Sequence, residues 1–599
     1  MLARLRSEFT YLKATRRILA RTSVVAAEPN RTIADRSEEW AAQWGERVAL
    51  KSEREELTYR QLSERANQVA RWARAQGLKK GDAICLMMPN RPEYIAIWLG
   101  MARAGLITAL INTNLAGPAL AHCIAISAAK AFIIDTALLP QFERARALIA
   151  PEIAIFAHGP SPDAAPRIDM MLQTISGASL SGDERCALTI EDGALYVFTS
   201  GTTGLPKAAR ITHSRLLRIM FGFSAVLDAK PSDRMYIAMP MYHSNGGIIA
   251  PGAALSAGGS CFIREKFSAN EFWRDIVAAE CTLFVYVGEL CRYLLNAPPT
   301  PLDKAHKVRA CVGNGLRPDI FVAFQRRFEI ADIREFYGAT EGNIVLFNMD
   351  SWPGSVGRIP RWAAKRFPIK IVAYDVETGA LKRDAQGHCC ECANGEPGEL
   401  ISQILNDPKM PAARFDGYAD KAATEQKILR NAFVNGDAWF RTGDLLAKNA
   451  RGYFFFIDRI GDTFRWKGEN VSTTEVAEAI AVFPGVRDVS VYGVESPGAD
   501  GRAGMAALNV EDPQKIDLVG LRAHIAAHLP IYARPVFLRL KNDLELTGTF
   551  KQKKTTLMAE GFDTTQTADP IFFDDRILGA YRRIADDFAD QIRRGVVKI

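Results

Sequence analysis

The sequence has little cysteine, little histidine and no long apolar run. Of 599 residues, 10 are cysteine and 8 are histidine, a density far below that of small secreted domains held together by disulfides. We therefore expect a reducing, cytoplasmic environment, and no signal peptide is recognisable. The most hydrophobic stretch, residues 94–111, contains Arg103 and two glycines. It predicts a buried helix, a turn and a buried strand instead of a membrane span.

The chain also lacks a strong charge imbalance. Its 75 basic and 68 acidic residues give a formal net charge of +7, which is too small an excess to indicate a nucleic-acid partner. Hydrophobic residues make up 48% and charged residues 24%, as in ordinary globular proteins. At about 150 residues per domain, the length suggests roughly four domain-sized units, some of which could be fused.

The first 25 residues are basic and have apolar residues near helical spacing. Two interpretations stay open: an amphipathic helix on the anionic inner face of a membrane, or a helix that is solvated or packed on the protein itself. A transit peptide would need a cleavage signal, and none is clear. The basic residues are Arg4, Arg6, Lys13, Arg16, Arg17 and Arg21, opposed by the acid Glu8, and the apolar residues are Leu2, Leu5, Phe9, Leu12 and Leu19.

Predicted elements change character along the chain. From about residue 56 to 290, apolar strands alternate with helices, which favours parallel sheets covered on both faces. Residues 355–457 are rich in short strands and turns, and residues from about 462 onward predict a compact α+β domain. We therefore expect an α/β fold: a large N-terminal domain of stacked sheets with a small β-rich subdomain, followed by a smaller C-terminal domain. The predicted segments are 1–40, 41–460 and 461–599, with a hinge at residues 458–462.

Residues 196–207 have the composition of a phosphate-binding loop. A strand leads into a run of hydroxyl residues and glycines, and Lys207 closes the run. Glycines let backbone N–H groups turn towards an anion, hydroxyls add donors, and lysine adds positive charge. The spacing is not that of a Walker motif. The residues of the run are Thr199, Ser200, Gly201, Thr202, Thr203 and Gly204.

This loop resembles the phosphate loop of the adenylate-forming superfamily, which contains acyl-CoA synthetases, adenylation domains and luciferases. Segments similar to the family's other motifs follow in the family's order, at residues 337–341, 441–444, 458–459 and 548–551, and the resemblance spans roughly residues 40–560. A narrower similarity, in residues 415–418, 427–431, 458–472 and 547–551, is to the fatty acid transport protein branch, which contains very-long-chain acyl-CoA synthetases.

The resemblance implies an enzyme that uses ATP and Mg²⁺ to make an acyl-adenylate and then transfers the acyl group to coenzyme A. The hydroxyls of the loop and Lys207 would hold the β- and γ-phosphates, and Glu341 would hold Mg²⁺. Thr340 would contact the α-phosphate, and Asp444 would accept hydrogen bonds from the ribose with help from Arg459. The residues implied to enclose the adenine or to belong to its motif are Gly313, Asn314, Gly315, Tyr337, Gly338 and Ala339.

The C-terminal part carries the implied catalytic lysine and a mobile domain. Lys551 matches the family's position, although Thr549 and Phe550 stand where serine and glycine are usual, so Lys553 is the alternative. In the family the C-terminal domain swings about the hinge, where this chain has Gly461. Trp466, Lys467 and Gly468 would then approach the CoA channel.

Residues 241–247 resemble the family segment that lines the acyl tunnel. His243 would lie near the substrate carboxylate, although it could instead pack in the core. Gly247 stands where some long-chain synthetases have a gating tryptophan, so the tunnel would admit long or bulky acids. Long-chain or very-long-chain fatty acids are the first expectation. The alternatives are a ligase for a bulky acid or a carrier protein, and fatty acid uptake by metabolic trapping. A homodimer is left open.

Overall fold

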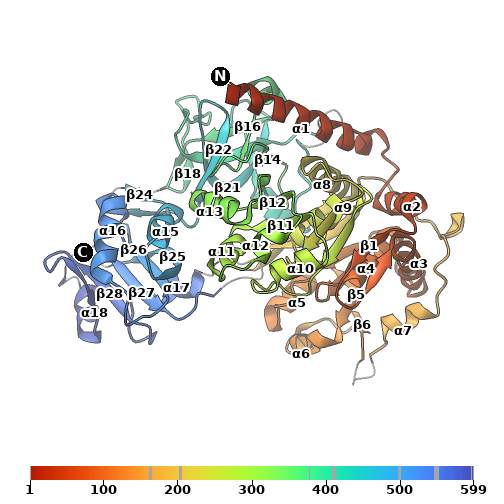
Figure 1. The fold of residues 1–599 in the computed structure, drawn as a ribbon, viewed down its shortest axis with the longest axis horizontal. Helices are drawn as coiled ribbons and strands as arrows, with labels where there is room; N and C mark the ends of the chain where they lie inside the picture. The colour runs from red at the N-terminus through yellow and green to blue at the C-terminus, as the bar shows by residue number, and fades with distance from the viewer. Residues whose placement is uncertain are drawn as a thin grey trace. The chain divides into compact units, whose positions relative to one another are not determined.

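The computed structural model describes residues 2–160, 165–200, 205–376, 378–407, 410, 413–467, 469–496, 501–545, 552, 554–594 and 596–597 (Figure 1). Two compact units are present. The first comprises Met1–Pro368 with Gln403–Leu429, and the second comprises Ile369–Ser402 with Arg430–Ile599. The domain boundary expected at residues 460–461 from the change in sequence pattern stays a prediction.

The first unit contains two mostly parallel sheets, in which only the pairs β13–β14, β1–β2 and β7–β8 are antiparallel among the described strands. The eight-stranded sheet has the order Val345–Asn348 (β14), Ile333–Gly338 (β13), Ala310–Asn314 (β12), Leu283–Val287 (β11), Arg234–Ile237 (β9), Ser260–Ile263 (β10), Val48–Lys51 (β1) and Glu56–Thr58 (β2). The six-stranded sheet has the order Ala154–His158 (β6), Ala129–Asp135 (β5), Ala83–Met87 (β3), Ile107–Leu110 (β4), Gly193–Ser200 (β7) and Pro206–Thr212 (β8).

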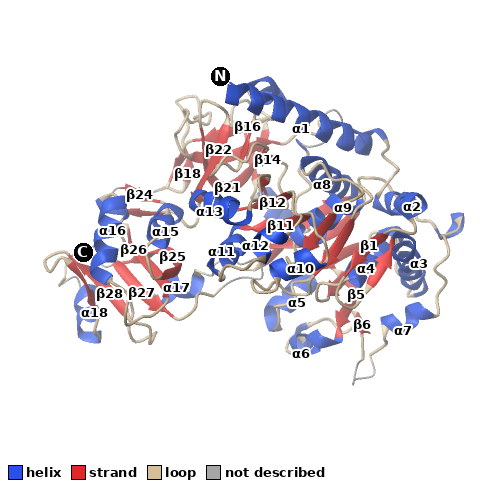
Figure 2. Cartoon of the chain, in the orientation of Figure 1, coloured by secondary structure: helices blue, strands red, loops and turns tan. Residues whose placement is uncertain are grey.

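Helices accompany the strands of the first unit, as Figure 2 shows. They are Leu2–Ala27 (α1), Ile33–Trp44 (α2), Tyr59–Ala75 (α3), Pro92–Arg103 (α4), Gly117–Ile126 (α5), Leu139–Glu143 (α6), Ile168–Gln173 (α7), His213–Val226 (α8), Ala250–Leu255 (α9), Phe272–Ala278 (α10), Gly288–Asn296 (α11), Leu302–Ala305 (α12), Pro318–Phe328 (α13) and Lys421–Glu425 (α14).

Helices α3 and α4 show how the sequence builds this unit. The Thr58 side chain caps α3 by accepting a hydrogen bond from the Gln61 backbone N–H, and the Gln61 side-chain oxygen accepts one from the Thr58 backbone N–H. This reciprocal pair is a capping box. α4 is buried along its whole length, and its residues between Glu93 and Arg103 are apolar or small. A Cβ at Gly100 would lie 2.5 Å from the Val69 Cβ, so the glycine allows the two helices to approach. The helix, turn and strand predicted at 94–111 are confirmed.

The second unit has a β-rich part and an α+β part. The β-rich part contains Ile369–Val372 (β16), Tyr374–Asp375 (β17), Ala380–Leu381 (β18), Gly398–Gln403 (β19), Ala438–Lys448 (β21) and Tyr453–Arg459 (β22), with β16–β19 and β21–β22 paired antiparallel. Phe464–Trp466 (β23) and Glu469–Val471 (β24) form a hairpin. The α+β part has a sheet of Val486–Glu495 (β25), Arg502–Val510 (β26), Phe537–Lys541 (β27), Ile571–Asp575 (β28) and Ala580–Arg583 (β29), with helices Thr473–Ala481 (α15), Leu518–His528 (α16), Thr555–Glu560 (α17) and Asp586–Arg593 (α18).

The predicted α/β class, with a larger N-terminal part and a smaller C-terminal part, is confirmed. Within the described residues, no helix combines the length and the apolar character that crossing a membrane requires.

Candidate active site

The predicted phosphate loop connects two paired strands. β7 and β8 form an antiparallel hairpin in which Thr199 is opposite Lys207 and Ser200 is opposite Pro206. The hairpin therefore fixes both ends of the loop. Gly201, Thr202, Thr203 and Gly204 lie outside the described residues, as does the side chain of Ser200.

Tyr418 joins the ends of this loop to the predicted magnesium ligand. Its hydroxyl donates to Glu341 Oε1 at 2.8 Å and also hydrogen-bonds the Thr199 side chain. The Lys207 ammonium lies 5.7 Å from the centroid of the Tyr418 ring, within cation–π range. Burial, and then the neighbouring Glu341 carboxylate, raise the pKa of Tyr418, so the phenol stays protonated and remains a donor.

The acyl segment and the adenine segments meet beside Glu341. Ser244 Oγ lies 3.3 Å from Thr340 Oγ1, and the Asn245 amide donates to Asn314 Oδ1 at 2.9 Å. Three predicted segments, residues 241–247, 313–315 and 337–341, are therefore neighbours. The half-buried Arg215 of α8 donates to the carbonyl of Ala339 at 3.0 Å, which fixes the backbone just before Thr340.

Two glycines allow the predicted adenine segment to approach β11 and α11. A Cβ at Gly313 would lie 2.3 Å from the Tyr286 carbonyl oxygen, and Gly315 has a φ of +79°. Larger residues would push the segment away or strain its backbone. Tyr337 is buried in β13, whereas Gly338 at the end of that strand is exposed. Glycine at these two positions therefore fixes how closely this segment approaches its neighbours.

Glu335, a residue that no sequence motif indicated, accepts hydrogen bonds from the backbone of this segment. Its Oε2 accepts from the Gly315 backbone N–H at 3.1 Å, and its Oε1 accepts from the Leu316 N–H at 3.2 Å and from the Tyr286 hydroxyl at 2.8 Å. Burial raises the pKa of Glu335 to about 8, although these three donors oppose the shift. The sequence signal that could have indicated Glu335 is an acidic residue in the middle of the mostly buried strand of residues 333–338.

We predict that Glu335 makes stability depend on pH. Because its pKa is higher in the folded state, the folded state binds the extra proton between about pH 4.5 and 8. The contribution to the free energy of unfolding is present below pH 4.5 and is lost as the pH rises through 8. The thermal midpoint should therefore fall more steeply from pH 6 to 9 in the native protein than in Glu335→Gln. Parallel pH profiles would contradict this prediction.

His243 lies half-buried between Tyr242 and a π-helical turn at Asn245–Ile249. The Tyr242 and His243 rings are 4.5 Å apart, and the His243 carbonyl accepts from the Gly247 N–H at 2.8 Å. A Cβ at Gly247 would lie 1.9 Å from the Met241 carbonyl oxygen. The backbone of this turn therefore admits no side chain at the position where a gating tryptophan was considered.

In the second unit, Asp444 and Arg459 face each other across β21 and β22. They are register partners, and Arg459 Nε lies 3.7 Å from Asp444 Oδ1. The Asp444 backbone N–H donates to Thr442 Oγ1 at 3.1 Å. Both predicted ribose-binding side chains thus come from one pair of strands, and the Asp444 side chain is 17% exposed, so it remains partly open to a ligand.

The predicted hinge is anchored on one side by Asp458. This buried carboxylate accepts from the Thr473 N–H at 2.6 Å and from the Arg459 N–H at 2.9 Å, and burial raises its pKa. Lys554 Nζ donates to Thr473 Oγ1 at 3.0 Å and lies 3.3 Å from Asp462. Gly461 is exposed, and a Cβ there would meet nothing within 4 Å, so space does not require a glycine at this position.

Lys467 is exposed with a φ of +50°, and its ammonium lies 5.2 Å from the centroid of the buried Trp466 ring. Burial lowers the pKa of Lys467, and Arg576 lowers it further. Gly468, Lys551 and Lys553 lie outside the described residues, and their functions stay predictions.

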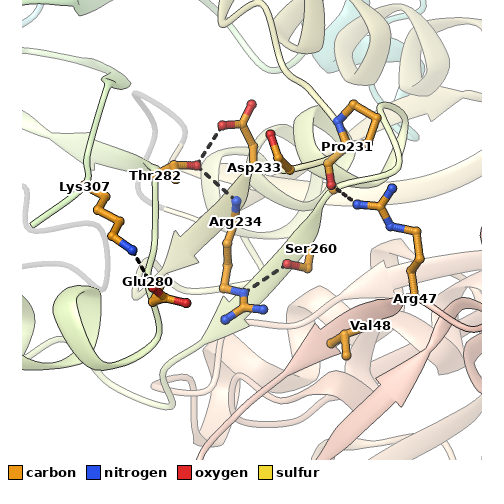
Figure 3. Close-up of a pocket in the computed structure, with 11 residues that line it drawn as sticks. Arg47, Val48, Pro231, Asp233, Arg234, Ser260, Glu280, Thr282 and Lys307 are labelled. Atoms are coloured by element: carbon orange, nitrogen blue, oxygen red, sulfur yellow. Dashed lines mark hydrogen bonds and ion pairs between the residues drawn. The ribbon is translucent and has the colours of Figure 1, made fainter.

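A cavity of about 460 Å³ lies elsewhere in the first unit (Figure 3). Charged side chains of this cavity already have partners in the protein. Arg47 donates to the Pro231 carbonyl, Arg234 Nε donates to Ser260 Oγ at 3.0 Å, and Lys307 forms an ion pair with Glu280. The residues that line it include none of the predicted site residues. We therefore place the candidate site at the Glu341 cluster and not at this cavity.

Comparison with family models shows the family of the chain. Residues 37–403 match the model of the AMP-binding enzyme family, and residues 475–551 match the model of the AMP-binding enzyme C-terminal domain. The first match covers more than half of the chain. The chain belongs to the AMP-binding enzyme family. The predicted membership of the adenylate-forming superfamily is thereby confirmed.

Curated relatives of this AMP-binding enzyme confirm the narrower similarity. It is 42% identical to long-chain fatty acid transport protein 3 of Mus musculus over 517 residues, which is 86% of this chain and 76% of the relative. It is also 42% identical to long-chain fatty acid transport protein 1 of Homo sapiens over 534 residues, which is 88% of this chain and 81% of the relative. The enzyme therefore belongs to the fatty acid transport protein branch.

Solved structures share the fold of this AMP-binding enzyme. The anthranilate CoA ligase AuaEII in complex with anthranoyl-AMP has a TM-score of 0.74 at 22% identity, covering 88% of this chain and 96% of the other. ATP-bound MatB from Rhodopseudomonas palustris has a TM-score of 0.72 at 23% identity, covering 88% and 98%. The Mycobacterium tuberculosis fatty acyl CoA synthetase has a TM-score of 0.61 at 22% identity, covering 89% and 98%. At these identities the shared property is the adenylate-forming fold.

Proposed function

We propose that this enzyme is an ATP-dependent acyl-CoA synthetase that activates long-chain or very-long-chain fatty acids through an acyl-AMP intermediate. The observation that carries the proposal is the cluster of Thr199, Lys207, Glu341 and Tyr418. It brings a hydroxyl, a cation and a carboxylate from separate motifs of an AMP-binding enzyme to one place.

In the first step a carboxylate oxygen of the fatty acid attacks the α-phosphorus of ATP, and pyrophosphate leaves. The barrier comes mostly from charge repulsion and positioning, so the protein contributes electrostatically. We assign the β- and γ-phosphates to Lys207, Thr199 and the loop between them. Thr340 contacts the α-phosphate, and His243 lies near the fatty acid carboxylate. The bare backbone at residues 313–315 and Tyr337 enclose the adenine.

The residues present fit a magnesium ion held partly by the nucleotide. Among the described residues, no group of three or more histidine, cysteine, aspartate or glutamate side chains forms a complete metal site. Mg²⁺ usually binds through one or two carboxylates together with substrate phosphates, and Glu341 supplies one carboxylate. When bound, the ion would neutralise charge that develops on the phosphates. Tyr418 then acts as a positioning residue, because its hydroxyl fixes one oxygen of Glu341.

We predict that Tyr418→Phe weakens magnesium binding, and so raises the Mg²⁺ concentration that activity requires, without unfolding the site. The substitution keeps the ring beneath Lys207 and removes the hydroxyl's hydrogen bonds to Glu341 and Thr199. Loss of such an outer partner typically costs about 10- to 100-fold in metal affinity or activity. The measurement is the Mg²⁺ concentration at half-maximal pyrophosphate release, with Tyr532→Phe as the control at a partly exposed tyrosine. An unchanged Mg²⁺ requirement would exclude this function for Tyr418.

In the second step the thiol sulfur of CoA attacks the acyl carbonyl carbon, AMP leaves, and the thiol loses its proton. We assign the ribose hydroxyls to Asp444 and Arg459. We assign the rearrangement between the two steps to the hinge around Gly461, and contact with CoA to Lys467 and Gly468. The second unit supports these assignments by placing Asp444 and Arg459 opposite each other and by leaving Lys467 exposed.

The substrate class rests on the relatives and on Gly247. The relatives are named long-chain fatty acid transport proteins, and the turn at Gly247 carries no gating side chain. The test is pyrophosphate release by the purified protein across acids from acetate to very-long-chain and bile acids, each with and without CoA. Turnover that peaks on long chains and requires CoA supports the proposal. CoA-independent adenylation would favour a carrier-protein ligase instead, and a maximum on bile acids would favour a bulky substrate.

The relatives' name favours a second function, fatty acid uptake driven by trapping the product as acyl-CoA. Such uptake needs the same active site and no separate translocation path. Cells that express the protein should then import labelled fatty acid, and Glu341→Gln should abolish the increase. Full import by that variant would contradict trapping. A peripheral position on the inner face of a membrane belongs to this proposal, and homodimer formation stays a prediction.

A further inference from the structure

Helix α1 is packed on the first unit along one face. The Tyr11 hydroxyl donates to the Phe347 carbonyl at 3.1 Å, and Arg21 NH1 donates to Ser224 Oγ of α8 at 2.7 Å. Tyr11 and Val25 are buried, and Figure 1 shows α1 running beside α8. The interpretation as a helix packed on the protein is therefore correct for this face. The helix is a fixed part of the unit's surface.

The opposite face of α1 exposes large apolar side chains. Leu5 is 56% exposed, Phe9 68%, Leu12 46% and Leu19 45%. Their spacing of four, three and seven residues places them on one side of a helix. Single exposed apolar residues are normal, but a continuous stripe of them on a fixed helix indicates a surface that binds something apolar. We call these four residues the outer stripe.

Basic residues flank the outer stripe, and the helix's acid is already engaged. Glu8 is the sole acidic residue among residues 1–27. It is ion-paired with Arg358 and accepts from the Trp362 indole N–H at 3.0 Å, so its charge is compensated within the protein. The exposed basic residues of the helix are Arg4, Arg6, Lys13 and Arg16.

A second segment of the first unit extends this surface. The 3₁₀ turn Arg361–Arg366 lies beside the start of α1, because Trp362 contacts Glu8. Trp362 is 48% exposed and Phe367 is 39% exposed, and Arg361, Lys365 and Arg366 are also exposed. Exposed aromatic rings next to basic side chains are typical of the water–lipid interface.

A groove of about 340 Å³ beside α1 adds positive charge at the same place. Phe9 and Lys13 line it together with three arginines and two aspartates. The aspartates, Asp228 and Asp332, are each ion-paired with an arginine of the groove. The third arginine, Arg309, is ion-paired with Asp233, so a phosphate-bearing headgroup would meet Lys13 in this groove, directly beside the apolar stripe.

We propose that the outer stripe and residues 361–367 form a docking surface for an anionic lipid bilayer. The apolar side chains would enter the headgroup region while the flanking cations contact anionic lipids, which is how interfacial helices bind. The charge pattern favours an anionic bilayer as the binding partner, because exposed cations flank the stripe. The nearby acids Glu8, Asp228 and Asp332 are each ion-paired with an arginine of the protein. The inference rests on the peripheral membrane position included in the proposed function and names the surface that would provide it, and none of these residues belongs to the proposed active site.

The test is sedimentation of the full chain with vesicles of phosphatidylcholine alone or with added phosphatidylserine, without ATP or fatty acid. We expect binding to the anionic vesicles that weakens with salt. Phe9→Glu with Leu12→Glu should weaken it at least about tenfold, and Lys13→Glu with Arg16→Glu should remove the preference for phosphatidylserine. The matched control is Leu148→Glu with Met170→Glu, two residues of the same unit that are similarly exposed.

Binding that is equal for all variants, or absent from the native protein, would overturn the proposal. So would a native dimer in sedimentation velocity that Phe9→Glu with Leu12→Glu converts to monomer while vesicle binding is unchanged, because the stripe would then be covered by a second copy. Circular dichroism and the thermal midpoint establish that each variant is folded. Because no reaction is measured, failure of this proposal is distinguishable from failure of the proposed activity.

Discussion

Replacing Lys551 with alanine is expected to lower the rate of acyl-adenylate formation by about 10²-fold or more. A cation present in the first step would offset the repulsion between the attacking carboxylate and the α-phosphate and stabilise the negative charge that moves towards the phosphate oxygens and the leaving pyrophosphate. The resemblance assigns that cation to Lys551. The measurement is pyrophosphate release in a single turnover with ATP, Mg²⁺ and a long-chain acid, compared with CoA-thioester formation from acyl-adenylate supplied in its place.

The second half-reaction is the control for this variant. In the family the C-terminal domain exchanges the lysine for a CoA-binding surface, so thioester formation from supplied acyl-adenylate should survive in Lys551→Ala. Lys553→Ala is the matched substitution two residues away, and it should leave both steps nearly unchanged. If both half-reactions fell equally in Lys551→Ala, or if Lys553→Ala showed the adenylation defect instead, the assignment to Lys551 would be wrong.

The elements that the sequence predicted well are those whose local signals agree. Helix α3 has a capping box at Thr58 and an apolar face, and the strands at β3, β4 and β5 are short apolar runs bounded by turn residues. The same agreement holds for α15, β25, β26 and α16 in the second unit. Each of these elements could be recognised without knowledge of its neighbours in space.

The contacts of the candidate site could not be predicted in this way. Tyr418 and Glu341 are 77 residues apart in the chain, and no periodicity links them. Tyr418 was visible in the sequence as part of a family segment, but its hydrogen bond to Glu341 follows from the pairing of residues 209–210 with 417–418. Glu335 was missed for a different reason: it belongs to none of the family segments, and the residues around it in the sequence indicate only a buried strand.

The N-terminal helix shows a third limit. Sequence periodicity left open whether α1 packs on the protein or meets a membrane, because the spacing of apolar residues does not show which face has a partner. In the structure Tyr11 and Val25 are buried, whereas Phe9 and Leu12 are exposed. The two interpretations were alternatives only while the helix was considered without its neighbours.

Glu341→Gln should lower pyrophosphate release by about 10²- to 10³-fold and raise the Mg²⁺ concentration needed for half-maximal activity. Glutamine keeps an oxygen that can accept from the Tyr418 hydroxyl, so the local structure should survive while the negative charge is lost. Glu152→Gln, at an exposed turn of the same unit, is the matched control and should retain full activity. Native activity in Glu341→Gln would contradict the assignment of Glu341 as the magnesium ligand.

Combining Glu341→Gln with Tyr418→Phe tests whether the tyrosine acts through the carboxylate. If Tyr418 only orients Glu341, its removal should matter much less once the carboxylate charge is gone, so the double variant should be nearly as active as Glu341→Gln alone. If the effects of the two substitutions multiply, Tyr418 must contribute by another route, and its hydrogen bond with the Thr199 side chain is the contact to examine. Thr199→Val in the native and Tyr418→Phe backgrounds then shows whether the Tyr418 hydroxyl also acts through Thr199.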